Sequence, residues 1–424
     1  VNHSEFSELG LADPIQRALH ARNHIVPTPI QARAIPELMA GHDVLGIAQT
    51  GTGKTAAFAL PILHRLANAP RANGSRAPRA LILAPSRELA IQIYEDFRAY
   101  GRELNLRHAV IYGGVSQRPQ VDAINRGIDI LVATPGRLLD LMNQRRIDLG
   151  SVEFLVLDEA DRMLDMGFIR DVRKIIAAVP RRRQSLMFSA TMPQEITRLS
   201  AEILARPVRV EVTPQATPIE ALEQGVYFVP ASGKIPLLGK LLADPALSRV
   251  LVFTRTKHRA NRVAEQLARL GIEIAAIHGN KAQSARQRAL ADFRAGKVRV
   301  LVATDIVARG IDVDSVTHVI NFELPNEPEA YVHRIGRTAR AGAGGIAISL
   351  CDPAEREFLS DIERLIRRNL NVIGHAPSGP ASTEPRRAHH HGNKPQQAHG
   401  HGRPHSAARA PRPQSRGRRR RRAA

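Results

Sequence analysis

A glycine-rich segment near the start of the chain, AQTGTGKT, has the residue types and spacing of a phosphate-binding loop. Glycines let backbone N–H groups wrap around phosphate oxygens, and the start of a following helix adds its dipole. Lys54 is placed to reach the β- and γ-phosphates, and the Thr55 hydroxyl can bind Mg²⁺. A plain glycine-rich turn is the alternative, but an apolar run before the segment and an Ala/Leu-rich stretch after it favour a nucleotide site. The predicted site comprises Ala48, Gln49, Thr50, Gly51, Thr52, Gly53, Lys54 and Thr55.

Two adjacent carboxylates, Asp158 and Glu159, follow the apolar run at residues 152–157. The carboxyl end of a buried strand is where an α/β sheet places its chemistry. Asp158 is suited to hold Mg²⁺ through water, and Glu159 to orient or deprotonate an attacking water. Adjacent acids alone could be only a polar strand end. Together with the upstream loop, they predict hydrolysis of ATP with Mg²⁺ as cofactor.

Elements that could position these groups alternate along the chain between residues 40 and 350. Short β-branched runs separated by helical patterns predict parallel sheets that helices cover on both faces. Three prolines punctuate a polar stretch at 205–219, where a linker is expected. The segments 130–137 (ILVATPGR) and 300–310 (VLVATDIVARG) are similar, which favours two related lobes. Strands are expected at 43–48, 80–84, 128–133, 152–157, 185–189, 250–254, 298–304 and 316–322.

Composition limits the class of protein. The chain has 424 residues, too many for one ordinary domain, and 43% of them are hydrophobic, enough for more than one core. The single cysteine excludes a disulfide framework, and no apolar run approaches the ~20 residues of a membrane span. We therefore expect a soluble, cytoplasmic protein.

The formal charge of +21 is concentrated at the end of the chain. Residues 371–424 contain 12 Lys and Arg and one acidic residue, Glu384, which leaves about +10 for the other 370 residues. This stretch has almost no large apolar side chains, so a disordered tail is predicted. Its arginines should hold RNA without sequence preference. A protein partner, plain solubility or a metal site of irregularly spaced histidines are the alternatives.

A series of sequence blocks over residues 6–350, with Asp-Glu-Ala-Asp at 158–161 among them, resembles the DEAD-box family of ATP-dependent RNA helicases. The overall pattern is most similar to the bacterial RhlE-like branch. The resemblance implies an α/β fold with two RecA-like parallel-sheet domains in tandem, a cleft between them and the disordered basic tail. The implied parts are an ATP-binding domain (1–206), a linker (207–219), a C-terminal domain (220–370) and the tail (371–424).

The segment NHIVPTPIQ at residues 23–31 resembles the family's adenine-recognition element. By this resemblance Gln31 hydrogen-bonds the base, Thr28 supports the phosphate-binding loop, and Phe6 stacks on adenine. A carboxamide can pair with the N6 donor and N7 acceptor of adenine together, which gives ATP selectivity a physical reason. A proline-rich turn before a helix would explain the prolines but not the match of the distant Phe6.

Loops of both lobes resemble those that lie along the RNA backbone in the family. Arginines can neutralise phosphates there, and paired glycines permit close approach of the backbone. Taken singly, such segments are ordinary strand-to-helix turns. The implied RNA-binding residues are Pro85, Arg87, Gly113, Gly114, Thr134, Arg137, Arg255, Arg286 and Thr304.

The block HRIGRTAR at residues 333–340 resembles the family segment that supplies arginine fingers, which implies that Arg337 and Arg340 reach the γ-phosphate. Its three arginines recur at every third position and would lie near one face of a helix, where a solvated face is the alternative. His333 is placed with the catalytic groups, and Asp312 with the ribose. The residues implied to couple the two domains are Ser189, Thr191, Asp161 and Arg334.

Three positions depart from the family pattern: His24 replaces an aromatic residue, Ser86 a threonine and Ala339 a glycine. We expect looser packing of the adenine element, a retained hydroxyl, and an extra methyl near the arginine fingers. The expected activity is separation of short RNA duplexes, with ATP hydrolysis releasing the RNA. A translocating DNA helicase and an ATP-gated RNA clamp with incidental turnover are the alternatives. Ribosomal or RNA-decay assemblies are candidate partners, and a monomer is expected.

Overall fold

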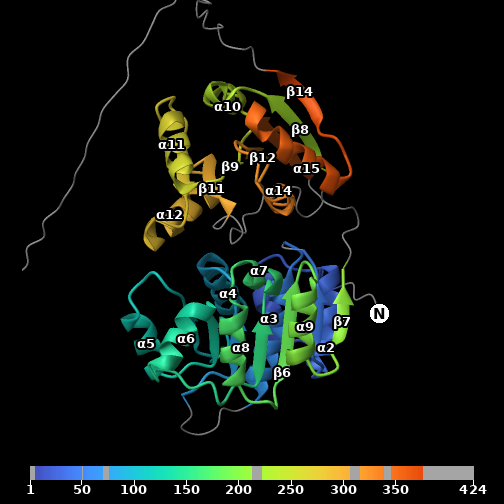
Figure 1. Ribbon diagram of the computed structural model, residues 1–424. Helices are drawn as coiled ribbons and strands as arrows, with labels where there is room; N and C mark the ends of the chain where they lie inside the picture. The colour runs from blue at the N-terminus through green and yellow to red at the C-terminus, as the bar shows by residue number, and fades with distance from the viewer. Residues whose placement is uncertain are drawn as a thin grey trace, which may run out of the picture. The chain divides into compact units, whose positions relative to one another are not determined.

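The computed structural model describes residues 5–49, 51–69, 76–212, 222–305, 316–338 and 345–375. These residues form two seven-stranded sheets, one in a first lobe (5–212) and one in a second lobe (222–375). Every strand pairs in parallel with its neighbours, and helices flank both sheets (Figure 1). The predicted pair of parallel α/β sheets is therefore confirmed.

The first sheet has the strand order β3-β4-β2-β5-β6-β1-β7. Its strands are β1 (Val44–Ile47), β2 (Ala80–Leu83), β3 (His108–Ile111), β4 (Ile130–Ala133), β5 (Phe154–Leu157), β6 (Gln184–Ser189) and β7 (Val208–Glu211). The helices of this lobe are η1 (Phe6–Leu9), α1 (Asp13–His20), α2 (Pro29–Met39), α3 (Lys54–Asn68), α4 (Arg87–Tyr100), α5 (Arg118–Asn125), α6 (Pro135–Asn143), α7 (Ala160–Asp165), α8 (Ile169–Ala177) and α9 (Gln194–Ile203).

Alternate residues of each central strand of this sheet enter two separate cores. Ile82 and Val156 pack with α2, α3 and α4 on one face. Leu83 and Leu157 pack with α6, α8 and α9 on the other face, which Figure 1 shows in front of the sheet. Burial on both faces explains why these strands are continuous apolar runs rather than alternating ones.

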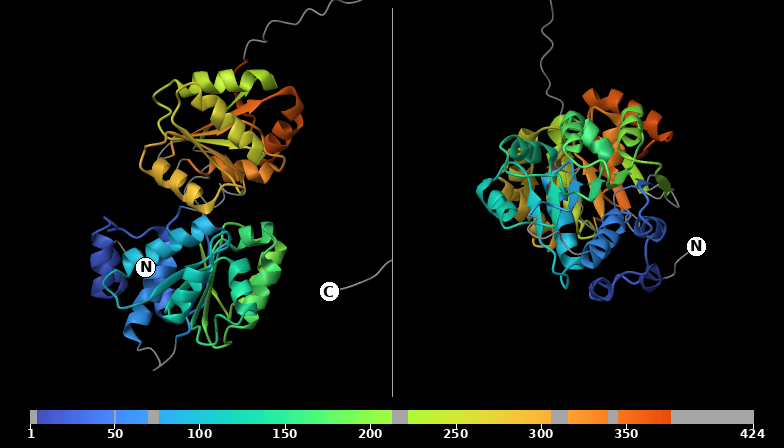
Figure 2. Two further views of the ribbon diagram at one scale, coloured as in Figure 1. Left: turned by 90° about the vertical axis from the view of Figure 1, so that its left-hand side faces the viewer. Right: turned by 90° about the horizontal axis from the view of Figure 1, so that it is seen from below.

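The second sheet has the order β10-β11-β9-β12-β13-β8-β14. Its strands are β8 (Leu222–Phe228), β9 (Val250–Thr254), β10 (Ile274–Ile277), β11 (Val300–Thr304), β12 (His318–Asn321), β13 (Gly345–Cys351) and β14 (Asn371–His375). The helices are η2 (Ala231–Gly233), α10 (Lys234–Leu242), α11 (Lys257–Ala268), α12 (Gln283–Arg294), α14 (Pro328–Ile335), η3 (Pro353–Glu355) and α15 (Arg356–Ile366). Figure 2 shows two further views of these elements.

Two predicted boundaries are wrong. Residues 208–211, assigned to the linker, form β7 and pair with β1, because Val208 and Val210 pack on the first core. Residues 371–375, assigned to the disordered tail, form β14 and pair with β8. The Ile373 side chain packs over Gly225, where a Cβ would lie 2.3 Å from Ile373 Cδ1. Residues 213–219 of the predicted linker and 376–424 of the tail lie outside the described residues.

No helix among the described residues is both long enough and apolar enough to cross a membrane.

Candidate nucleotide and RNA site

The predicted phosphate-binding loop connects β1 to α3, the strand-to-helix position that the sequence predicts. Gly53 takes a left-handed conformation (φ +89°) immediately before the helix, and a Cβ there would lie 2.4 Å from Gln31 Nε2. Lys54 is buried, and its Nζ donates to the Ala48 carbonyl at 2.8 Å. The Thr52 hydroxyl donates to the Gln49 carbonyl at 2.8 Å. The loop is thus shaped by its own backbone carbonyls.

The adenine-element residues bond directly to this loop. Gln31 Nε2 donates to the Gly53 carbonyl at 3.0 Å, and Gln31 Oε1 accepts from the Thr28 N–H at 2.8 Å. The Thr28 hydroxyl donates to the Thr52 carbonyl at 2.8 Å. A single carboxamide therefore joins the start of α2 to the predicted phosphate-binding turn.

One cavity of about 550 Å³ is lined by residues from five separate stretches of the chain. Concave sites with converging polar groups are the usual ligand sites. Of the predicted loop residues that the structure describes, Ala48, Gln49 and Thr52 do not line this cavity. Phe6 lies in its wall and is buried at 4% exposure. The predicted residues that line the cavity are Phe6, Thr28, Gln31, Gly51, Gly53, Lys54, Thr55, Asp158 and Glu159. Thr50 lies outside the described residues.

The two carboxylates after β5 have different surroundings. Asp158 is 2% exposed, and its Oδ1 has no hydrogen-bond partner. Burial raises the pKa of Asp158 to about 7, although the Lys54 ammonium opposes this shift. Glu159 lies in the left-handed region (φ 54°) and forms an ion pair with Arg162. Such backbone strain in a non-glycine residue is common at functional positions.

Asp161 ties the end of β5 to the segment after β6. Its Oδ2 accepts from the Thr191 N–H at 2.8 Å and from the Thr191 hydroxyl at 3.0 Å. The Asp161 N–H donates to the Ser189 hydroxyl at 3.2 Å, and that hydroxyl donates to the Thr191 carbonyl at 2.8 Å. Three of the four predicted coupling residues thus form one hydrogen-bonded group within the first lobe.

The predicted RNA-binding loops of the first lobe follow β2, β3 and β4, which are neighbours in the sheet. The Arg87 guanidinium lies against Gly114, where a Cβ would be 2.1 Å from its Nη1 and where φ is +79°. Arg137 donates to the Val115 carbonyl at 3.2 Å, and its Nη1 has no partner. Pro85 and Thr134 are buried, and Gly113 is half-buried.

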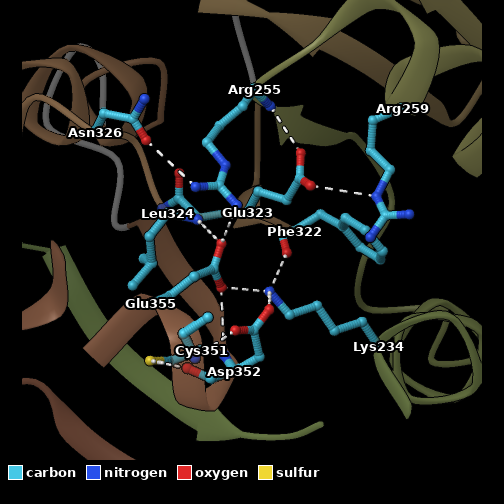
Figure 3. A network of polar contacts seen from close by, with 12 residues as sticks. Lys234, Arg255, Arg259, Phe322, Glu323, Leu324, Asn326, Cys351, Asp352 and Glu355 are labelled. Carbon is cyan, nitrogen blue, oxygen red and sulfur yellow. Dashed lines mark hydrogen bonds and ion pairs between the residues drawn. The ribbon is translucent and has the colours of Figure 1, made fainter. Parts of the chain in front are cut away.

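Arg255, a predicted RNA contact of the second lobe, belongs to a polar network (Figure 3). Its guanidinium lies 3.2 Å from Glu355 Oε1 and donates to Asn326 Oδ1 at 3.3 Å. Its backbone N–H donates to Glu323 Oε2 at 2.9 Å. The side chain is 32% exposed, so it is anchored at one end while still accessible to solvent.

The other two predicted RNA contacts of this lobe are buried. Arg286 forms an ion pair with Glu88 at 2.7 Å, and burial lowers the pKa of its guanidinium. Thr304 ends β11 and is 7% exposed.

Arg334 and Arg337 of the HRIGRTAR block do not lie on one helix. The helix α14 ends at Ile335, one residue after Arg334, so the three-residue spacing does not continue as helix. Arg334 is 1% exposed and pairs with Asp305 at 2.6 Å, so its direct contacts lie within the second lobe. Arg337 is buried, its pKa is lowered to about 10 mainly by burial, and it donates to the His333 carbonyl at 3.2 Å. Arg340 and Asp312 lie outside the described residues.

Arg162 and Asp305 are among the partners of predicted site residues that sequence reasoning missed. Arg162 pairs with Glu159, and an acid and a base three residues apart in DEADR could have indicated it. Asp305 pairs with Arg334 from a distant segment, so no local signal was available.

The structure also describes two of the three departures from the family pattern. Ser86 keeps the capping role of its hydroxyl, which accepts from the Leu89 N–H at 3.2 Å. His24 contacts Tyr100, with 3.4 Å between Nδ1 and the phenol oxygen, and its pKa is lowered by burial and by Arg22. Ala339 lies outside the described residues.

Comparison with known proteins now identifies the family. The pattern of the DEAD/DEAH box helicase matches residues 28–199, and that of the helicase conserved C-terminal domain matches residues 233–342. The chain is 41% identical over 366 residues to the DEAD-box ATP-dependent RNA helicase CshA of Bacillus cereus, covering 86% of this chain and 69% of that one. It is 42% identical to the ATP-dependent RNA helicase DeaD of Mycobacterium tuberculosis, covering 86% and 64%.

A solved structure agrees with the sequence comparisons. Saccharomyces cerevisiae Dbp5 bound to RNA and ADP BeF3 superposes with a TM-score of 0.76 at 31% identity, covering 88% of this chain and 96% of that one. The two sheets are therefore tandem RecA-like domains, and neither alternative activity is favoured. A place in the RhlE-like branch remains a prediction. This chain belongs to the DEAD-box family of ATP-dependent RNA helicases.

Proposed function

We propose that ATP binds with Mg²⁺ in the first-lobe cavity and that its hydrolysis drives local separation of short RNA duplexes. The observation that carries this proposal is the convergence of Gln31, Lys54 and Glu159 on one cavity of about 550 Å³. Groups for the base, the phosphates and the attacking water come from three distant segments, which a structural glycine turn would not require.

Base selectivity rests on Gln31. Its carboxamide can offer one donor and one acceptor to adenine. In the proposed complex it would keep part of its bonding to Thr28 and Gly53, so recognition of the base would order the phosphate-binding turn. Phe6 would supply the stacking surface, because its ring lies in the same cavity wall.

Asp158 and Thr55 fit a Mg²⁺ site. Asp158 Oδ1 is a buried oxygen without a hydrogen-bond partner, and Thr55 lines the same cavity. Mg²⁺ prefers few protein oxygens supplemented by water and phosphate. When bound, the ion would neutralise charge that develops on the phosphate oxygens. Glu159 would accept a proton from the attacking water, with its carboxylate oriented by Arg162.

Turnover would require the second lobe. Arg337 would deliver its guanidinium to the γ-phosphate, while Arg87, Arg137 and Arg255 contact the RNA backbone. Backbone contacts position a strand without selecting its sequence. ATP and RNA should then bind with reciprocal positive coupling, since each stabilises the same closed arrangement. The group formed by Asp161, Ser189 and Thr191 would transmit that arrangement between the nucleotide site and the RNA.

The decisive experiment measures ATPase rate with poly(U) RNA, with single-stranded DNA and without nucleic acid, alongside unwinding of a short RNA duplex. Stimulation by RNA but not DNA, together with unwinding, is expected. Equal stimulation by DNA would contradict the RNA specificity, and turnover without unwinding would indicate a clamp.

The domain bounds, the location, the oligomeric state and the partners of the protein are part of the same proposal. We take residues 5–212 and 222–375 as the two domains, and we expect a cytoplasmic monomer acting on ribosomal or RNA-decay assemblies. Analytical ultracentrifugation of the full chain would test the monomer.

A further inference from the structure

A set of exposed arginines lies at the amino edge of the first sheet, the edge opposite to the nucleotide cavity. Loops that enter neighbouring strands supply them: Arg107 precedes β3, Arg126 precedes β4, Arg76 precedes β2, and Arg145 and Arg146 precede β5. We call these five residues the basic edge.

The amino edge holds much of the charge of the folded body. The loops entering β3, β4, β2, β5 and β6 (101–107, 126–129, 76–79, 144–153 and 178–183) contain ten arginines and four carboxylates, a net charge of +6. Residues 1–370 carry about +10 in total. A mild overall excess is therefore concentrated in one place, where it can attract a polyanion.

Carboxylates do not neutralise the basic edge. Arg76 Nη1 donates to the Asn125 carbonyl at 3.2 Å, and Arg107 Nη1 donates to the Arg126 carbonyl at 2.6 Å. Within the described part of the chain, no ion pair involves Arg126, Arg145 or Arg146. Some arginines elsewhere in this lobe do form ion pairs with carboxylates, as in Arg22–Asp96 and Arg173–Glu202.

The nearby acids are already engaged with the backbone. Asp129 Oδ2 accepts from the Arg107 N–H at 2.9 Å, and Asp148 Oδ1 accepts from the Gly150 N–H at 2.9 Å. The carbonyl bonds of the arginines hold their guanidinium groups in place without consuming their charge. A guanidinium fixed in this way loses less entropy on meeting a phosphate.

A groove of about 640 Å³ runs between these loops. Arg76, Arg145 and Arg146 line it together with one carboxylate, Asp148, and with the polar and apolar residues Ala77, Pro78, Ile124, Asn125, Met142, Ile147 and Ser151. Hydrogen bonds between Gln117 and Gln144 hold the α5 and α6 regions together beside it, and Figure 1 shows these two helices side by side. None of the exposed large hydrophobic residues lies here. The larger apolar residues of the groove, Ile124, Met142 and Ile147, are buried or half-buried, so the exposed arginines around them suit a phosphate backbone better than a protein partner.

We propose that the basic edge binds the phosphate backbone of RNA beyond the segment held by the catalytic loops. Several arginines spread over four loops match a polymer better than a single phosphate. The catalytic loops follow the strands, so the strand length of about 13 Å and the loops at both ends separate the two surfaces. RNA just long enough to fill the catalytic loops does not reach the basic edge, whereas a longer RNA or a flanking duplex does.

The test uses the full chain with the double variant Arg145→Glu/Arg146→Glu. The matched control, Lys174→Glu/Arg198→Glu, makes the same charge change on exposed faces of α8 and α9. Fluorescence anisotropy over a salt series measures affinity for a short oligouridylate and for an RNA several times longer. ATPase rate with saturating short RNA serves as the readout of the catalytic site.

For the basic-edge variant we expect a roughly tenfold loss of affinity for the long RNA, with the log–log salt slope reduced by ~0.7 per lost single-strand phosphate contact. Short-RNA affinity and turnover should match those of the unchanged chain. Arg145→Lys/Arg146→Lys should retain most long-RNA affinity.

Three outcomes would overturn the proposal. Unchanged long-RNA binding would show that the basic edge does not bind RNA, and an acidic protein would then be the better candidate partner. An equal loss in the control would indicate only net charge. A loss of short-RNA turnover would place these arginines in the catalytic unit, provided thermal unfolding confirms that the variant is folded. The proposed helicase activity is tested separately, by RNA-stimulated ATP hydrolysis.

Discussion

The two sheets have the same strand topology, but the lysine that follows the sixth strand has different partners in each lobe. In the two strand orders, β1 and β8 occupy the sixth place. After β1 the chain reaches Gly53-Lys54 at the start of α3, and after β8 it reaches Gly233-Lys234 at the start of α10. Each lobe thus places a buried lysine at the first residue of the helix that follows corresponding strands.

The partners of the two lysines differ. Lys54 Nζ donates to a backbone carbonyl, and its side chain lines the cavity of about 550 Å³. Lys234 is paired with Glu355 and with Asp352 at 3.1 Å, and it donates to the Phe322 carbonyl at 3.1 Å (Figure 3). The second lobe therefore supplies its own anions where the first lobe leaves room for phosphates. The same position can bind a substrate or stabilise a domain, depending on whether carboxylates follow β13.

The glutamates that follow the fourth strand of each sheet also have different surroundings in the two lobes. In the fourth strand of each order, β5 is followed by Asp158-Glu159 and β12 by Phe322-Glu323. Glu159 faces the nucleotide cavity. Glu323 accepts from the Arg255 N–H and lies 3.2 Å from Arg259 Nε. Glu159 therefore lies at the candidate nucleotide site, whereas Glu323 bonds to the backbone of Arg255, a predicted RNA contact.

The largest expected effect comes from Lys54→Ala, which should abolish ATP binding. Among the described residues, Arg22 is the one other cation that lines the cavity, and it lies beside the adenine-element segment rather than in the predicted phosphate-binding loop. Folding should change little, because the lost bond is one contact to a carbonyl. Titration with a fluorescent ATP analogue measures the effect, and unchanged affinity would mean that the loop is misassigned.

Arg337→Ala should reduce RNA-stimulated turnover by ~10³-fold or more, as for an arginine finger. ATP binding should persist, because the cavity walls are built from the first lobe alone. The steady-state rate at saturating RNA and ATP measures this, with an ATP titration as the control. Normal turnover would show that the guanidinium does not reach the γ-phosphate.

Glu159→Gln should reduce hydrolysis by about 10²–10⁴-fold, the contribution of a general base. ATP and RNA should still bind, since the amide keeps the shape of the side chain, and a long-lived complex with both should accumulate. Single-turnover kinetics separates this from slow product release. A variant with near-normal single-turnover rate would move the base to another residue.

Lys234→Met should act on stability and spare ATP binding. Removing the cation leaves Glu355 and Asp352 without their buried partner, at a cost of about 3–5 kcal/mol. Urea unfolding measures the loss, and Lys240→Met, an exposed change on the same helix, is the matched control. If both variants unfold alike, the carboxylates do not depend on Lys234.

Sequence reasoning located most strands and the first-lobe site because their signals are local. The loop at Gly51–Lys54 and the acids at Asp158 and Glu159 each follow a recognisable apolar run. Lys234 was not recognised, since its meaning depends on Glu355, 121 residues away. β14 was missed because Asn371–His375 adjoins a tail of different composition, and only the pairing with β8 makes it a strand.

The smallest expected effect, and the sharpest comparison, comes from Glu323→Gln. The substitution is the same as at Glu159 and occupies the corresponding strand end, yet it should leave hydrolysis within about twofold, because Glu323 contributes to no predicted nucleotide contact. The amide can still accept from the Arg255 N–H, while the charge that faces Arg259 is lost. Glu323 is largely buried, so a stability loss of about 1 kcal/mol is expected. Because Arg255 keeps its contact with Glu355, RNA affinity should fall only a few-fold, as for one weakened charge contact.

ATP hydrolysis rates of Glu159→Gln and Glu323→Gln, measured in parallel, test whether the two glutamates have different roles. A fall in turnover as large as that of Glu159→Gln would show that the second glutamate also acts on ATP, and the division of roles between the lobes would be wrong.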